Sequence, residues 1–132
     1  VAVRPQTSLG VGQYTNIVGR WTARVKYDWG DEYTEVFEFK YLGKTLHGTA
    51  SYLTGRLTIE QAKVEGEWVS FITHSQQMLG SDNPWKEVTH RYTGQITPAG
   101  IHFTLEDSGG YTPHGPVEFV ARREAGKSEG GK

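Results

Sequence analysis

Short segments in which apolar and polar residues alternate run through most of this chain, and they constrain the fold more than any other feature. In the first of them, the apolar positions are Trp21, Ala23, Val25 and Tyr27, with polar residues between them. A period of two places alternate side chains on one face of a β-strand. Eight such segments are separated by turn residues: Val18–Asp28, Tyr33–Leu42, Thr45–Tyr52, Arg56–Val64, Trp68–Gln76, Lys86–Thr97, Ile101–Glu106 and Val117–Arg123. An all-β fold follows, because the one helix candidate, Ile59–Val64, is too short to be stable.

The connections between these segments are of two kinds. Tight glycine turns lie at Gly43, Gly66 and Gly100. The other connections lie at 29–32, 53–55, 77–85 and 107–116, and the last two of them are long. If the strands run up and down in chain order, the glycine turns and Trp21 share one end, which we call the base. The other connections share the opposite end, which we call the mouth. Long loops on a rigid scaffold are where binding residues tend to lie.

The first and last segments carry residues that together match a known sequence pattern. Asn16, Gly19 and Trp21 form an N-x-x-G-x-W arrangement, and Arg122 and Arg123 end the last segment. This pattern resembles that of the calycins, the lipocalin and avidin-like group. The resemblance implies an eight-stranded antiparallel up-and-down (meander) β-barrel, in which Trp21 packs at the base against Arg122 or Arg123 through a cation–π contact.

The resemblance is closer to some calycins than to others. The chain lacks the helix that follows the barrel in full lipocalins, the biotin-binding pattern of avidins and the glycine-rich opening of the nitrobindin-type haem barrels. It looks more like the small lipocalin-like domains of bacterial proteins. Biotin and haem are therefore not carried over, and no cofactor is expected.

Size and composition limit the remaining possibilities. A length of 132 residues suits one domain, which we place at 16–123, after a leader or linker at 1–15 and before a disordered tail at 124–132. A net charge of −1 gives no basic field for nucleic acid. No apolar run is long enough to span a membrane, so we expect a soluble protein, cytoplasmic or exported. Because the sequence starts at Val1 without an initiator Met, we expect a processed product or a domain cut from something longer, and the linker-like segment Arg4–Ser8 favours the second.

Aromatic and polar residues gather at the predicted mouth. They suit an apolar or planar ligand, or a partner surface, and they are Trp29, Tyr33, Tyr52, Met78, Trp85, Tyr111 and His114. The alternative is that Trp29 and Trp85 only cover the end of the core.

Two polar residues fall on apolar faces inside the predicted barrel. Glu35 shares a face with Phe37, and His90 shares one with Tyr92. If they meet, they form an acid and base pair; otherwise each belongs to a structural hydrogen-bond network. The five histidines show no local metal-ligand spacing, so no metal site is predicted. Ser70, Ser75 and Ser108 lack a nucleophile-elbow pattern, so serine hydrolysis is not supported by the sequence.

Three functions remain open at this point. The first is a noncatalytic barrel that binds a small apolar or aromatic ligand at its mouth. The second is an accessory domain with a filled barrel that binds a protein partner. The third is an isomerase or hydrolase that uses His90 and Glu35.

Overall fold

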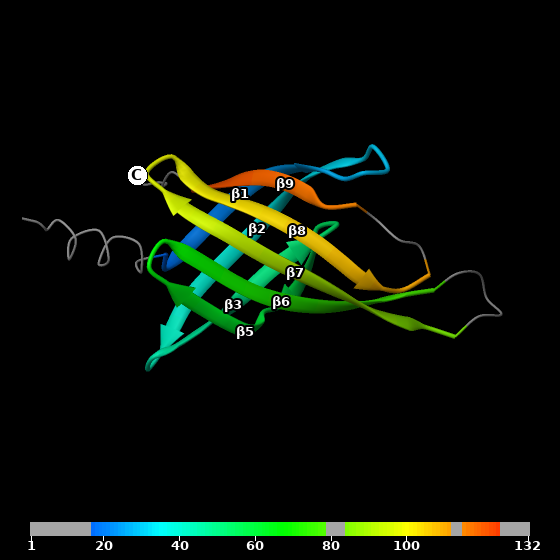
Figure 1. Cartoon of the computed structure of the whole chain (residues 1–132), viewed down its shortest axis with the longest axis horizontal. Helices are drawn as coiled ribbons and strands as arrows, with labels where there is room; N and C mark the ends of the chain where they lie inside the picture. Colours follow the sequence, from blue (N-terminus) through cyan, green and yellow to red (C-terminus); the bar gives the residue numbers. More distant parts are fainter. Residues whose placement is uncertain (1–16, 79–83, 112–114, 125–132) are drawn as a thin grey trace, which may run out of the picture.

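Strands account for about three quarters of the described residues in the computed structural model, which describes residues 17–78, 84–111 and 115–124 (Figure 1). Within those ranges there is no helix, and so none that could cross a membrane. The strands are β1 (Gly19–Lys26), β2 (Glu32–Leu42), β3 (Thr45–Tyr52), β4 (Gly55–Thr58), β5 (Glu60–Glu65), β6 (Trp68–Gln77), β7 (Lys86–Thr97), β8 (Gly100–Gly109) and β9 (Val117–Arg123). The predicted all-β class is confirmed.

All nine strands belong to one antiparallel sheet in the order β4-β3-β2-β1-β9-β8-β7-β6-β5. Each strand pairs with its neighbours in the chain, except that β9 returns to pair with β1 and that β4 and β5 do not pair. The hydrogen-bonded ladder of the described strands is therefore not closed into a barrel. The sheet nevertheless curves until its edges approach, since β5 lies near β3 and the Ile59 N–H donates to Gly48 O at 3.0 Å.

The predicted count of eight strands is wrong, because the segment Arg56–Val64 forms two strands, β4 and β5. Ile59, between them, is buried and continues the alternation of Leu57, but Glu60 and Gln61 are both exposed, so the alternation shifts by one residue there. Gln61 adopts a φ of 54°, and the pairing of β5 with β6 shifts between Glu60 and Lys63. Such a bulge turns the chain from one edge of the curved sheet to the other. The other seven segments are strands, with ends that differ from the predicted ones by a few residues.

Aromatic rings fill the middle of the curved sheet. Phe37 stacks on Phe103 and Phe119 with ring centroids 5.4 and 5.8 Å apart, and Phe71 stacks on Tyr92 at 4.7 Å. These side chains come from five different strands and are all less than a tenth exposed. The middle of the curved sheet is therefore packed with side chains.

The base is built as predicted, with Arg123 in the basic position. The guanidinium of Arg123 lies over the Trp21 ring, 4.5 Å from its centroid, and donates to Val18 O at 2.6 Å. The Trp21 indole N–H donates to Ile17 O at 2.9 Å. Gly19 has a φ of 131°, and a Cβ there would lie 2.9 Å from the Arg123 guanidinium. The glycine therefore makes room for the cation that covers the tryptophan.

The two ends of the sheet differ as expected (Figure 1). The turns β2–β3, β5–β6 and β7–β8 lie at the end where β1 begins, and the β1–β2 and β3–β4 connections lie toward the other end. The predicted leader at 1–15, Asn16 and most of the predicted tail lie outside the described residues. Glu124, the first residue of that tail, is described: its N–H donates to Arg20 O at 2.9 Å and its carboxylate pairs with Arg20.

Replacing the tryptophan at the base should be costly. We expect Trp21→Ala to lower the free energy of unfolding by about 3–5 kcal/mol, because a large buried ring is lost and leaves a cavity. Trp85→Ala is the matched control, since that ring is 58% exposed, and its effect should stay within about 0.5 kcal/mol. Urea denaturation measures both values. Equal losses at the two positions would contradict the assignment of Trp21 to the core.

Candidate functional site

A pocket of about 320 Å³ opens at the mouth. Its apolar walls come from the β1–β2 turn, β3 with the turn after it, and β7: Trp29, Tyr52, Leu53 and Val88. Its polar side comes from β6, β7 and β8: Ser75, Gln76, Gln77, His90 and Asp107. A mainly apolar cavity with a few convergent polar groups is the usual form of a small-molecule site.

The register of three neighbouring strands brings the polar groups together. His90 on β7 lies directly opposite Asp107 on β8, and Ser75 on β6 lies opposite Val88, two residues from His90. Residues two apart on a strand share a face, so Ser75, His90 and Asp107 all point to the concave side of the sheet. Three strands that are adjacent in the sheet therefore supply one cluster.

These three side chains form a continuous hydrogen-bonded relay. His90 is fully buried; its Nδ1 lies 2.7 Å from Asp107 Oδ1 and its Nε2 lies 2.7 Å from Ser75 Oγ. An ionised carboxylate only accepts hydrogen bonds, so Nδ1 carries the proton of the neutral imidazole and Nε2 accepts from the Ser75 hydroxyl. The order of donation is therefore from Ser75 to His90 to Asp107.

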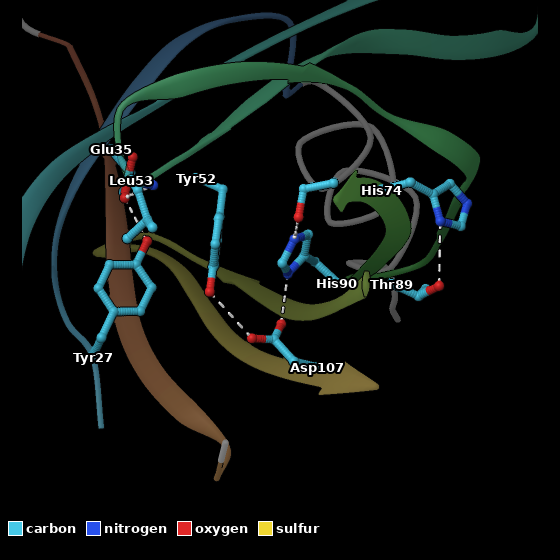
Figure 2. A network of polar contacts seen from close by, with 9 residues as sticks. Tyr27, Glu35, Tyr52, Leu53, His74, Thr89, His90 and Asp107 are labelled. Atoms are coloured by element: carbon cyan, nitrogen blue, oxygen red, sulfur yellow. Dashed lines mark hydrogen bonds and ion pairs between the residues drawn. The ribbon is translucent and has the colours of Figure 1, made fainter. Parts of the chain in front are cut away.

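Tyr52 joins this relay from the apolar side of the pocket (Figure 2). Its ring lies 4.0 Å from the His90 ring, centroid to centroid, and its hydroxyl makes a long hydrogen bond of 3.4 Å to Asp107 Oδ2. Burial, together with the negative charge of Asp107, raises the pKa of Tyr52 well above its usual range. The hydroxyl therefore stays a donor, and the ring restrains the imidazole.

Glu35 is the centre of a second network. It is 1% exposed and accepts four hydrogen bonds: one carboxylate oxygen from the Ser51 hydroxyl and the Thr54 N–H at 2.6 and 2.9 Å, the other from the Tyr27 hydroxyl and the Leu53 N–H, the latter at 2.7 Å. Leu53 and Thr54 have φ values of 53° and 68°. A buried carboxylate that accepts from two consecutive backbone amides stabilises this left-handed turn.

The hypothesis that Glu35 and His90 form an acid and base pair is wrong. Both side chains point inward as expected, but each ring nitrogen of His90 is occupied by Ser75 or Asp107, and both oxygens of Glu35 have other donors. Figure 2 shows Tyr52 between them. The partner of His90 is Asp107, from the adjacent strand, and Glu35 has a structural role at the β3–β4 turn.

Two of the seven predicted mouth residues line the pocket, Trp29 and Tyr52. Tyr33 lies instead beside Tyr27, with ring centroids 6.1 Å apart, and Met78 and Trp85 are 46% and 58% exposed without lining it. Tyr111 is held by the loops, since its hydroxyl donates to Pro84 O and its N–H donates to Gln77 Oε1. His114 lies outside the described residues.

Ser75 and Asp107, on the polar side of the pocket, were not predicted from the sequence as site residues. Asp107 continues the inward alternation of Phe103 and Leu105, and Ser75 continues that of Phe71 and Thr73. The alternation is the signal that could have found both, but the predicted strand ended at Glu106 and Ser75 belongs to no local sequence motif. Among the described residues, no group of three His, Asp or Glu side chains is arranged to hold a metal ion.

Removing the charge of Glu35 should destabilise the fold. In Glu35→Gln one acceptor oxygen becomes an NH2 group, and in either orientation that group faces a backbone N–H. We expect a loss of at least about 2 kcal/mol in the free energy of unfolding, because a buried donor loses its acceptor. The control is Glu38→Gln, since Glu38 forms an exposed pair with Arg20 worth about 0–1 kcal/mol. Similar losses in the two variants would contradict the network around Glu35.

Alkaline pH should unfold the protein through its buried tyrosines. Burial raises the pKa of Tyr27, Tyr52 and Tyr92, aided by hydrogen bonding to Glu35 at Tyr27 and by the charges of Asp107 and Glu35 at the other two. The unfolded chain loses these protons near pH 10 while the folded chain keeps them, so the contribution of these tyrosines to stability is constant below about pH 9 and falls above about pH 10. Denaturant titrations across this range, followed by tyrosinate absorbance, measure the loss. Ionisation of all seven tyrosines before unfolding would contradict it.

Comparison of the chain with protein-family models, with curated proteins and with solved structures gives no match. The function is therefore inferred from the pocket, its aromatic wall and the relay formed by Ser75, His90 and Asp107.

Proposed function

We propose that this chain is a lipocalin-like β-domain that binds a small, uncharged, planar molecule in the pocket at its mouth. The observation that carries the proposal is the pocket itself: about 320 Å³, with aromatic walls on one side and an ordered set of polar groups on the other. This combination gives apolar contact area and a fixed orientation to a ligand of modest size.

The aromatic wall supports a planar ligand. Trp29 stacks on Tyr27, with ring centroids 4.7 Å apart and planes within 9°, and its indole N–H donates to Asp31 at 2.8 Å. The exposed fraction of Trp29 is 40%, and its side chain lines the pocket. A ring fixed by its neighbours costs little conformational entropy when a ligand packs on it.

The polar side supports a ligand with a hydrogen-bond donor. The Ser75 hydrogen is directed to His90 Nε2, so toward the pocket the Ser75 oxygen acts as an acceptor. An amide N–H or a hydroxyl satisfies it. No Lys or Arg of the described chain lines the pocket, whereas Asp107 does, so an anionic ligand would meet repulsion without a counter-charge.

The lipocalin-like assignment draws on the shape of the sheet. Three features support a likeness to small calycin barrels: the up-and-down strand order, the return of β9 to β1, and the contact of Trp21 with Arg123. The gap in the ladder between β4 and β5 is the point of difference. In such folds a packed base and an open mouth direct ligands to one end.

A screen of small neutral aromatic amides, phenols and indoles tests this function. A compound present at 100 times its dissociation constant should stabilise the fold by about 2.7 kcal/mol, which a thermal-shift measurement detects. Trp29→Ala should weaken binding at least tenfold because it removes the stacking surface. Trp85→Ala is the matched control: it removes another exposed tryptophan outside the pocket and should leave the affinity unchanged. Equal weakening by both variants, or binding that survives Trp29→Ala, would contradict the proposed site.

A further inference from the structure

The relay on the polar side of the pocket has the arrangement of a nucleophile, a base and a carboxylate. Its serine, imidazole and carboxylate are linked by two hydrogen bonds of 2.7 Å, and the serine lies at the pocket surface. We propose that Ser75 is a nucleophile, activated by His90 and Asp107, that accepts an acyl group from a small uncharged carboxylic ester. This activity goes beyond the proposed binding function and does not depend on the ligand found for it.

The geometry provides the parts of a general-base mechanism. The Ser75 hydroxyl donates to His90 Nε2, the atom that has to take its proton, and the Nδ1–H donates to Asp107, which stabilises the imidazolium that forms. Asp107 is a positioning residue because it acts through its hydrogen bond to His90 and not on the reacting atoms. Tyr52 holds the imidazole from its face, at 4.0 Å. No rearrangement of the relay is needed before proton transfer.

Burial separates the His90 imidazole from solvent while Ser75 faces the pocket. The side chain of His90 is fully enclosed and that of Asp107 is 10% exposed, so their hydrogen bond is shielded from water, where it is stronger than on a surface. Ser75 itself is only partly buried and lines the pocket. The base is therefore protected while the nucleophile is accessible to a substrate.

The reaction balances with an ester and water alone. Ser75 Oγ forms a bond to the ester carbonyl carbon while its proton moves to His90 Nε2; the carbon–oxygen bond to the leaving group breaks, and the alcohol or phenol leaves with that proton. The products are an acyl group on Ser75 and a free alcohol. Water then attacks the acyl carbon, gives a proton through His90 to Ser75 Oγ, and releases the carboxylic acid.

The pocket limits the substrate class. Trp29, Tyr52 and Leu53 offer a largely apolar wall, and Asp107 disfavours an anionic substrate. An aryl ester of a short carboxylic acid satisfies these conditions: its ring packs on the aromatic wall and its small acyl group reaches Ser75. The phenol of such an ester is also a good leaving group, so its departure depends little on proton donation from the enclosed His90 imidazole.

Covalent labelling tests the nucleophile directly. The folded chain is incubated with a neutral alkyl fluorophosphonate, which reacts with activated serines, and intact mass and peptide mapping identify the product. We expect one phosphonyl group per chain, on Ser75, with none in Ser75→Ala. Ser70→Ala is the matched control, because Ser70 lies on the same strand and outside the relay, and its labelling should equal that of the unchanged chain. An unlabelled but folded chain, or equal labelling of Ser75→Ala, would overturn the proposal.

The role of Asp107 is tested by the kinetics of the same labelling. Asp107→Asn should lower the limiting rate of labelling at least tenfold without changing the reagent concentration that gives half of that rate, and Asp107→Glu should restore part of the rate. A merely structural role would change both parameters or the melting temperature. An unchanged rate in a folded Asp107→Asn would overturn the proposed activation. If the neutral aromatic ligands bind but Ser75 is not labelled, the binding function stands and only the nucleophile fails.

Discussion

The register of β6, β7 and β8 is the constraint on which the site depends. These strands pair along most of their length, with Trp68–Gln77 opposite Lys86–Gln95 and Val88–Thr97 opposite Gly100–Gly109. Because side chains alternate between the two faces, a slip of one residue would move His90 to the convex surface and replace it with a neighbour. The aromatic core fixes the register, since Phe71, Tyr92 and Phe103 are on the same three strands and contact each other in its middle. Packing at the centre of the sheet therefore positions the side chains of Ser75, His90 and Asp107 at the mouth.

Two carboxylates, the buried Glu35 and the partly buried Asp107, lie at the same end of the molecule and accept hydrogen bonds from different donors. Glu35 accepts four hydrogen bonds, two of them from the backbone, and serves to hold a turn. Asp107 accepts from an imidazole and, at longer distance, from Tyr52, and it lines the pocket. The difference in partners separates their roles: a carboxylate saturated by donors of fixed position is structural, whereas one that polarises a titratable side chain can support chemistry.

Much of the fold could be predicted from the sequence, because alternation in strands such as Val117–Arg123 is a local property. The contact between Trp21 and Arg123 was also accessible, since the pattern of the first and last strands carries it. The split of Arg56–Val64 was not, because the bulge at Gln61 follows from how a curved sheet brings its edges together. The candidate site could be predicted only in part. His90 and Glu35 were recognised as inward, but their partners depend on which strands are neighbours and in what register, and that is set by tertiary pairing.

The unpaired edges of β4 and β5 give the pocket two walls of different stiffness. His90 is paired on both sides, with Thr73 of β6 and Asp107 of β8, whereas β4, which follows the turn at Leu53, pairs only with β3. Strands with fewer backbone partners open at lower free energy than those in the middle of a sheet. A ligand that enters the mouth therefore meets a histidine held between two strands on one side and, on the other, a turn that leads to the edge of the sheet. The most firmly held group of the pocket is then the one that selects among the ligand's functional groups.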